Sequence, residues 1–365
     1  MENFNKFNYM EKYGYEQMVF FHDQHTGLKA ITAIHNTVNG PALGGSRFWN
    51  YANEDEAMED ALRLAKGMTY KNSIAGLPLG GGKTVIWGDV EAIRKDPILE
   101  EAFWRSFGRY IEGLNGRYIT AADMNTRTQD MVQINKETKN VVGLPGKSGN
   151  PSPYTALGVL RSMQACVNFV YGSDDLSGKV VAIQGLGAVG YSLAEQLHEK
   201  GAKLIVTDIN ETVLEKAKNE LGATVVGLDD IHTVEADIYA PCARGAVVNP
   251  TTIPQIKAKI ICGSANNVLA EEERDGKLLV EAGLIYAPDY LANAGGVINV
   301  AHELREGGYN EDASIADING IYGKMLTVLN TAKESGKPTF QVANEMAEER
   351  IARTMKLNSI YTRPR

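Results

Sequence analysis

Two lysines and an aspartate in the first third of the chain have side chains that could hold and move protons. Lys83 follows three consecutive glycines in GLPLGGGKTVIWG, Lys71 lies 12 residues before it, and Asp123 follows the run RYITAA. A lysine and a carboxylate can act as acid and base toward a substrate or bind its charged groups. Taken alone, a lysine at a helix end, as expected for Lys71, is most often a solvated charge that favours the helix dipole.

The glycine run before Lys83 suggests a loop that binds nucleotide triphosphates, but the sequence argues against it. Such a loop needs a glycine five residues before Gly82, where this chain has Leu77. It also follows a strand and opens a helix. Here DALRLAKGMTYKNSIA has helical spacing, and TVIW after Lys83 is strand-like. We therefore predict a helix, a glycine turn that carries Lys83, and a strand, with the glycines permitting close approach of a ligand or backbone.

A second pattern, later in the chain, indicates dinucleotide binding. KVVAIQ is a continuous apolar strand, GLGAVG supplies Gly185, Gly187 and Gly190, and the helical YSLAEQLHEKG follows. The next strand, KLIVTD, ends in Asp208, where a carboxylate can accept hydrogen bonds from a ribose 2′-hydroxyl. Because Asp208 would repel a 2′-phosphate, we predict NAD rather than NADP. A glycine-rich turn in an ordinary α/β domain is the alternative.

Two domains are needed to position these groups. Residues 17–40 predict a hairpin, and the helices and strands after it do not strictly alternate. GLPGKSGNPSP then interrupts both helix and strand, and strand-like segments recur between helices beyond it. The prediction is an α/β protein of two domains separated by a cleft, with three parts: a mixed α/β substrate-binding, catalytic and oligomerisation domain over 1–147, a doubly wound Rossmann domain over 148–330, and a C-terminal helix and tail over 331–365 that could pack back across the hinge.

Composition narrows the possible ligands and location. The net charge of −8, without clustered lysine and arginine, argues against a nucleic-acid or anionic-membrane surface. The polar start MENFNKFNYMEKYGYEQ carries neither a basic region nor an apolar run, so we expect no secretory signal or membrane span, and a cytoplasmic protein. Cys166, Cys242 and Cys262 are too few and too dispersed for a disulfide framework or zinc cluster, and we expect buried fillers and no metal.

Ordered motifs along nearly the whole chain resemble the Glu/Leu/Phe/Val amino-acid dehydrogenase family, most closely its leucine and phenylalanine branch. They are PALGGSR, DALRLAKGMTYKNSIAGLPLGGGKTVI, NGRYITAADM, QGLGAVG, VTDIN, YAPCARGAVVN, GSANN and YAPDYLANAGGVINVA. The resemblance implies an NAD-dependent enzyme that reversibly deaminates an L-amino acid to the 2-oxo acid and ammonia. It also implies a homo-oligomer, either an octamer or a dimer.

The resemblance assigns a role to each polar residue. Lys71 would pair with the substrate carboxylate, helped by the backbone at Gly44 and Gly45. Lys83 would activate the attacking water and polarise the carbonyl, and Asp123 would exchange protons with the amino group. Two neighbouring ammonium groups in a partly dry cleft repel each other, which favours loss of a proton from one of them.

The same resemblance places other residues around the cofactor and the substrate side chain. Around the cofactor it places Gly185, Gly187, Gly190 and Asp208 on the dinucleotide, Thr155 and Asn266 near the nicotinamide, and Ala243 close by through its backbone. Around the substrate side chain it places Leu43, Ala121, Val297 and Val300.

The four residues around the substrate side chain favour aliphatic amino acids. None is charged, so a glutamate side chain would be buried without a partner. Aromatic-preferring members tend to have glycine at the position of Ala121 and leucine at that of Val297, so we predict leucine, valine and isoleucine. Phenylalanine or tryptophan is the alternative substrate, and a catalytically idle NAD-binding scaffold is the alternative from another class.

Several residues depart from the family pattern or carry no predicted role. Arg244 stands where relatives usually have an apolar residue, Asn125 where glycine is common, and Ala122 where some relatives have an acid. Each could shift substrate range or pH optimum without removing the chemistry. Lys66 is predicted to be a structural or surface lysine.

Overall fold

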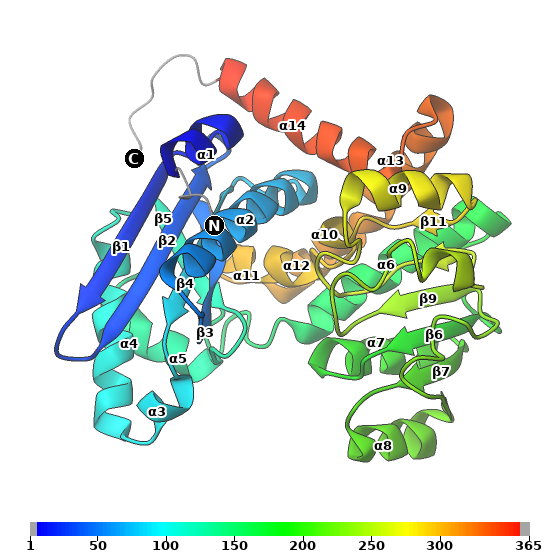
Figure 1. Cartoon of the computed structure of the whole chain (residues 1–365), viewed down its shortest axis with the longest axis horizontal. Helices are drawn as coiled ribbons and strands as arrows, with labels where there is room; N and C mark the ends of the chain where they lie inside the picture. Colours follow the sequence, from blue (N-terminus) through cyan, green and yellow to red (C-terminus); the bar gives the residue numbers. More distant parts are fainter. Residues whose placement is uncertain (1–5, 358–365) are drawn as a thin grey trace. The chain divides into compact units, whose positions relative to one another are not determined.

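The computed structural model describes residues 6–357 and divides the chain into two units (Figure 1). Among these residues, the first unit comprises 6–150, 300–309 and 347–357, and the second comprises 151–299 and 310–346. The sequence did not predict that 300–309 join the first unit. Part of the polar start, residues 1–5, and the last residues of the predicted tail, 358–365, lie outside the described residues.

The first unit is a mixed sheet with helices on both faces. Its strands are β1 (Gln17–Asp23), β2 (Leu28–Asn36), β3 (Ala42–Trp49), β4 (Gly80–Trp87) and β5 (Tyr118–Ala122). Its helices are α1 (Lys6–Tyr13), α2 (Glu54–Ala75), α3 (Val90–Arg94), α4 (Pro97–Glu112) and α5 (Thr128–Asn135). The sheet order is β1-β2-β4-β3-β5. The first two strands form the predicted antiparallel hairpin, β4 is antiparallel to β2, and β3 is parallel to both β4 and β5.

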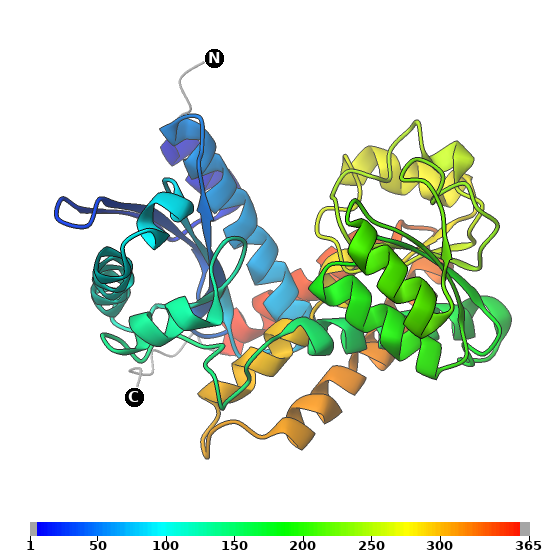
Figure 2. The ribbon, with the colours of Figure 1, turned by 90° about the horizontal axis from the view of Figure 1, so that it is seen from below.

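Alternation along the strands gives this sheet two apolar faces. Ile31 and Val85 pack with the apolar residues of α2, whereas Ile34 and Ile86 pack with the aromatic residues of α4. Figure 2 shows these two helices on opposite sides of the sheet. Residues two apart on a strand share a face, so Lys83 lies on the same face as Val85, toward α2.

Helix α2 has clear signals at both ends. The Asn53 side chain accepts a hydrogen bond from the Glu56 backbone N–H at 2.9 Å, and the first turn carries three acidic residues that favour the helix dipole. The helix ends where Gly76 takes a φ of 84°, a left-handed conformation suited to glycine. It is longer than the predicted stretch and begins before it.

The second unit is a parallel sheet with helices around it. Its strands are β6 (Val180–Gln184), β7 (Lys203–Thr207), β8 (Thr224–Val225), β9 (Ile238–Pro241), β10 (Ile260–Ile261) and β11 (Ile285–Tyr286). Its helices are α6 (Ser152–Tyr171), α7 (Ala188–Glu199), α8 (Glu211–Leu221), the 3₁₀ helix η1 (Ile253–Gln255), α9 (Glu272–Glu281), α10 (Asp289–Ala292), α12 (Glu311–Asn319) and α13 (Ile321–Ser335). The order β11-β10-β9-β6-β7-β8 is that of a doubly wound dinucleotide-binding sheet, as predicted.

Three remaining elements lie where the division between the units falls. They are α11 (Gly295–Ala301), the 3₁₀ helix η2 (His302–Leu304) and α14 (Thr339–Leu357). In η2, Glu303 accepts hydrogen bonds from the backbone N–H groups of Gly143, Leu144 and Ser148, which ties 300–309 to the first unit. The later part of α14 is held at the end of α2, where the Ser73 hydroxyl donates to the Ala347 carbonyl at 2.8 Å.

The structure also bears on the thiols, on membrane-spanning helices and on metal-binding clusters. Cys166 and Cys262 are buried as predicted, whereas Cys242 is only half-buried, and all three are free thiols. Within residues 6–357, no helix is long and apolar enough to cross a membrane, and no cluster of three His, Cys, Asp or Glu side chains could hold a metal ion.

Candidate active site

Lys83 lies inside strand β4, so the prediction that it sits in a glycine turn is wrong. Gly80, Gly81 and Gly82 are the first residues of that strand. A Cβ on Gly81 would lie 2.1 Å from the Thr69 backbone nitrogen of α2, and a Cβ on Gly44 of β3 would lie 1.9 Å from the Gly82 oxygen. The glycines therefore allow helix and neighbouring strand to pack directly against β4. This packing holds Lys83 rigidly, with only 5% of the residue exposed.

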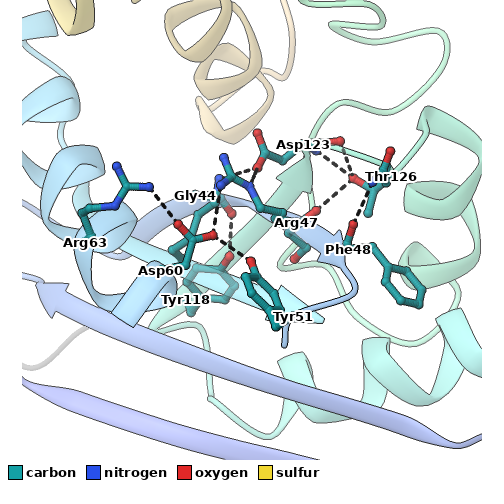
Figure 3. A network of polar contacts seen from close by, with 12 residues as sticks. Gly44, Arg47, Phe48, Tyr51, Asp60, Arg63, Tyr118, Asp123 and Thr126 are labelled. Carbon is teal, nitrogen blue, oxygen red and sulfur yellow. Dashed lines mark hydrogen bonds and ion pairs between the residues drawn. The ribbon is translucent and has the colours of Figure 1, made fainter. Parts of the chain in front are cut away.

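The structure brings Lys83 and Asp123 into contact, and Figure 3 shows Arg47 and Thr126 beside Asp123. The Lys83 Nζ lies 2.8 Å from Asp123 Oδ2, and Arg47 Nε, from strand β3, lies 3.2 Å from the same oxygen. The Asp123 side chain remains 29% exposed, whereas that of Lys83 is 6% exposed. A buried ammonium group thus meets a carboxylate that is open on one side.

Two cations hold the Asp123 carboxylate in its ionised form. Its burial alone would raise the pKa, but the positive charges of Lys83 and Arg47, the Lys83 hydrogen bond and the Met124 backbone N–H outweigh this and lower the pKa to about 2. The carboxylate is therefore charged at any ordinary pH. It is suited to accept hydrogen bonds from a substrate ammonium group.

A tight turn fixes the direction of Asp123. Its backbone N–H donates to Thr126 Oγ1 at 2.7 Å, and that hydroxyl donates to the Ser46 carbonyl of β3 at 3.0 Å. Asn125, within the turn, has a φ of 60°, and its side chain donates to the Phe48 carbonyl at 3.0 Å. Asparagine tolerates this left-handed conformation better than most residues, which explains how Asn125 can occupy the turn.

The sequence analysis missed the cluster that holds Arg47. Arg47 donates from its terminal NH1 to Asp60 Oδ2 of α2 at 3.0 Å, and Tyr51 OH and Arg63 also donate to Asp60, at 2.7 and 2.9 Å (Figure 3). A usable signal was present, because Arg47 lies two residues after Gly45 on the strand that begins with the quoted motif PALGGSR. Residues two apart on a strand share a face, so Arg47 lies on the same face of the sheet as Gly45, which was predicted to contact the substrate.

The other predicted substrate residues of the first unit lie on elements around this pair. Lys71 is half-buried on α2, and the neighbouring Asn72 donates to the carbonyls of Gly80 at 2.6 Å and Leu43 at 3.3 Å. These bonds join α2 to β4 and β3. Leu43 is fully buried in β3, Ala121 is half-buried in β5, and Val300 is buried in α11.

The predicted dinucleotide glycines connect β6 to α7. Gly185 follows β6 with a φ of 99°, and a Cβ there would lie 2.5 Å from the Cβ of Ala243, which follows β9. β6 and β9 are paired neighbours, and the strand order continues to β7 on one side and to β10 on the other. This turn therefore lies where the strand order reverses, which is where such sheets bind ligands. A Cβ on Gly190 would lie 2.1 Å from the Gly185 oxygen, so that glycine serves packing.

The residues around α7 fit a dinucleotide. Gly187 is the N-cap of α7, and a Cβ on it would meet nothing within 4 Å, so a pyrophosphate could approach the helix N-terminus there. Asp208 follows β7, and its carboxylate accepts from the Leu186 N–H of the glycine turn at 2.6 Å and from the Asn210 N–H at 2.8 Å. The carboxylate thus lies beside the turn, where a ribose hydroxyl would need it.

Thr155 and Asn266, predicted near the nicotinamide, lie in the same unit. The Thr155 hydroxyl donates to the Pro151 carbonyl at 3.0 Å in the first turn of α6. Asn266 Oδ1 accepts from Asn293 Nδ2 at 2.8 Å, so Asn293 is a further residue of this region that the sequence analysis did not identify. Val297 is half-buried in α11.

The remaining departures from the family pattern have simple surroundings. Arg244 is exposed in the segment after β9, and Ala122 is half-buried at the end of β5. Lys66 of α2 lies over the rings of Tyr13 and Tyr70, with its Nζ 4.9 and 5.6 Å from their centroids. This agrees with the prediction that Lys66 is structural.

Comparison with family models matches both parts of the chain. A model described as Glu/Leu/Phe/Val dehydrogenase, dimerisation domain, matches residues 15–140. A second model, described as Glutamate/Leucine/Phenylalanine/Valine dehydrogenase, matches residues 206–358.

Individual proteins are similar over nearly the full length. The chain is 55% identical to a leucine dehydrogenase of Thermoactinomyces intermedius, with 97% of this chain and 96% of that protein covered. It is 47% identical to a phenylalanine dehydrogenase of Lysinibacillus sphaericus, with coverage of 96% and 92%. The crystal structure of L-tryptophan dehydrogenase from Nostoc punctiforme superposes with a TM-score of 0.81 at 41% identity and covers 95% of this chain and 99% of that one.

Proposed function

This chain belongs to the Glu/Leu/Phe/Val dehydrogenase family, and from that premise we propose that it is an NAD-dependent enzyme that reversibly converts leucine, valine or isoleucine to the 2-oxo acid and ammonia. The observation that carries the proposal is the buried Lys83 ammonium in contact with the partly exposed Asp123 carboxylate. Oxidative deamination needs groups that take up protons and direct a water molecule, and this pair supplies both kinds.

Lys71, Asp123 and Lys83 each have a distinct task in the proposed reaction. Lys71 pairs with the substrate carboxylate, with help from the backbone at Gly44 and Gly45. Asp123 accepts a hydrogen bond from the substrate amino group, and the amine form of Lys83 takes up the proton that this group releases. Lys83 then directs water to the imino carbon and polarises the carbonyl that forms as ammonia leaves. A dinucleotide held at the glycine turn 185–190 would supply the acceptor for the hydride that leaves the substrate Cα.

The cofactor proposal rests on the second unit. The turn at Gly185, Gly187 and Gly190 and the N-terminus of α7 would hold the pyrophosphate, and Asp208 would accept from the ribose hydroxyls. Thr155, Ala243 and Asn266 would lie toward the nicotinamide. A negative charge at Asp208 would repel the additional phosphate of NADP, so NAD is the expected cofactor.

Apolar surroundings and similarity both favour a branched aliphatic substrate. Leu43, Ala121, Val297 and Val300 would surround the substrate side chain without any charged group. Identity is 55% to a leucine dehydrogenase, against 47% to a phenylalanine dehydrogenase and 42% to an L-tryptophan dehydrogenase. Pocket shape separates apolar side chains by only about 1–3 kcal/mol, so activity on phenylalanine or tryptophan is the second candidate.

The proposal includes assembly and location. The match of residues 15–140 to a dimerisation domain supports a homo-oligomer, and we propose an octamer or a dimer in the cytoplasm. The competing reading from another class is an idle NAD-binding scaffold. The scaffold differs from the enzyme in one structural requirement. Only the enzyme needs Lys83 and Asp123 to be in contact.

Replacement of Lys83 tests the catalytic assignment. In Lys83→Ala we expect turnover to fall by about 10²–10⁴-fold, because the proton-transfer group is lost. Binding of NAD, followed by calorimetry, should stay as in the wild type. Lys66→Ala is the matched control, since Lys66 lies on aromatic rings of the same unit and should keep normal turnover. Near-normal turnover in Lys83→Ala would support the idle scaffold instead.

A further inference from the structure

The two oxygens of the Asp123 carboxylate have different surroundings. Lys83 Nζ and Arg47 Nε both contact Oδ2, at 2.8 and 3.2 Å. No side chain of residues 6–357 donates a hydrogen bond to Oδ1. A carboxylate has about four lone-pair sites on its two oxygens, so Oδ1 keeps its capacity to accept from a substrate. The carboxylate is anchored through one oxygen and available through the other.

Arg47 is itself held from the opposite side. Its NH1 donates to Asp60 Oδ2 at 3.0 Å, and the Arg47 and Asp60 side chains are only 17% and 14% exposed. Asp60 also accepts from Tyr51 and Arg63, so the carboxylate has three donors. A planar guanidinium with donors in a fixed fork can bind two carboxylates at once, which lysine cannot do in the same geometry.

We propose that Arg47, fixed by Asp60, is a positioning residue that holds Asp123 by Oδ2 and so presents Oδ1 to the substrate amino group. The inference rests on the proposed amino-acid dehydrogenase activity and extends it to residues that bear no assigned role. Arg47 touches neither substrate nor cofactor in this account. It acts only through Asp123.

Charge gives this role a signature that a purely structural role lacks. The charged groups that face Asp123 come from three elements: Lys83 of β4, Arg47 of β3, and, behind Arg47, Asp60 and Arg63 of α2. Lys83 and Arg47 are the cations that lower the pKa of Asp123. Removing the positive charge of Arg47 makes the loss of a proton from a neighbouring protonated group harder, and removing the negative charge of Asp60 makes it easier.

The substitutions that test the proposal leave every charged partner with a neighbour. Without Arg47, Asp60 keeps Tyr51 and Arg63, and without the Asp60 charge, Arg47 keeps Asp123. A cavity of about 380 Å³ borders the cluster and is lined by Arg47, Asp60 and Arg63 among others, so a shorter or neutral side chain can be solvated. We therefore expect Arg47→Gln and Asp60→Asn to fold.

The kinetic test is the pH dependence of kcat for oxidative deamination at saturating amino acid. The acidic limb of this profile is the range in which kcat falls as the pH decreases. We expect it to move to higher pH by about 1 unit in Arg47→Gln and to move to lower pH in Asp60→Asn. Arg47→Lys keeps the charge, so its limb should stay in place while kcat falls by about tenfold or more through misplacement of Asp123. Limbs that do not move, or that move in the same direction in both variants, would overturn the proposal.

Matched controls come from an ion pair on the other face of the sheet. Arg105 Nε lies 2.6 Å from Glu137 Oε1, so Arg105→Gln and Glu137→Gln change charge by the same amounts in the same unit. Both should leave the pH profile and kcat as in the wild type. A shift in these controls equal to that in the test variants would assign the effect to net charge and contradict the proposal.

A second measurement does not depend on activity. A double-mutant cycle of Arg47→Gln and Asp123→Asn, followed by urea unfolding at pH 7, measures the coupling between the two side chains. We expect a favourable coupling, and independent effects of the two substitutions would overturn the proposal. If the cycle shows this coupling but the wild-type protein deaminates no amino acid, the result contradicts the proposed function and not the contact between Arg47 and Asp123.

Discussion

At the scale of single residues, the Asp123 carboxylate links the chemistry of the site to the stability of the first unit. Burial raises its pKa, but Lys83 and Arg47 more than offset this and bring it to about 2, below the value of about 3.9 for an unfolded aspartate. A group whose pKa is lowered on folding stabilises the folded state above its unfolded pKa. That contribution is lost as the pH falls through the folded pKa.

The free energy of unfolding should therefore depend on pH through this one residue. Between about pH 4 and pH 2, the wild type should lose a contribution on the order of 2 kcal/mol that Asp123→Asn does not lose. Urea unfolding of both proteins at pH 7 and at successive acidic pH values measures the difference between them. A difference that stays constant over this range would mean that the cations do not hold the carboxylate as described.

The sequence pointed to Lys83 and Asp123 but not to Arg47 and Asp60, which extend the same ion-pair cluster. Lys83 and Asp123 were marked by the glycines before one and the strand before the other, which are local signals. Strand spacing could place Arg47 on the same face as Gly45, but its pairing with Asp60 depends on β3 lying between β4 and β5 with α2 over the same face. Such an arrangement is a tertiary property that spacing along the chain does not express.

At the scale of elements, the predicted secondary structure was correct where apolar residues recurred with one helical or alternating period. It was wrong where a run of glycines was interpreted as a turn. The hairpin, the helical stretch within α2 and the strands β6, β7, β9, β10 and β11 were visible as alternating, helical or apolar patterns, whereas the two-residue strand β8 was not predicted. The run Gly80–Gly82 was assigned to a turn because glycine favours turns and disfavours strands. In the structure it is strand, since α2 and β3 approach too closely to admit a side chain.

The turn after β5 gives a stability prediction at this scale. Asn125 has a φ of 60° and donates to the Phe48 carbonyl, so Asn125→Ala should destabilise the protein by about 1–2 kcal/mol through backbone strain and the lost hydrogen bond. Asn125→Gly keeps the conformation available and should cost less. Thermal unfolding of the two variants compares them. Equal melting temperatures for Ala and Gly would refute the role of the left-handed backbone.

At the scale of the whole molecule, the chain is organised as a mixed sheet that carries the Lys83–Asp123 pair and a doubly wound sheet that carries the glycine turn and Asp208. The boundary predicted after residue 147 rests on the prolines and glycines of GLPGKSGNPSP, and the two units divide between Asn150 and Pro151. The membership of 300–309 in the first unit was not predicted, because it depends on Glu303 accepting hydrogen bonds from backbone far away in sequence. Linear composition carries no record of such contacts.

The most direct test of the account is the rate of NADH formation by the purified protein with NAD and a panel of L-amino acids at mildly alkaline pH. The panel includes leucine, valine, isoleucine, phenylalanine, tryptophan and glutamate. We expect the highest kcat/KM on leucine, valine or isoleucine and none on glutamate. Turnover confined to the aromatic amino acids would contradict the substrate assignment, and no turnover on any of them, with NAD bound, would contradict the proposed enzyme.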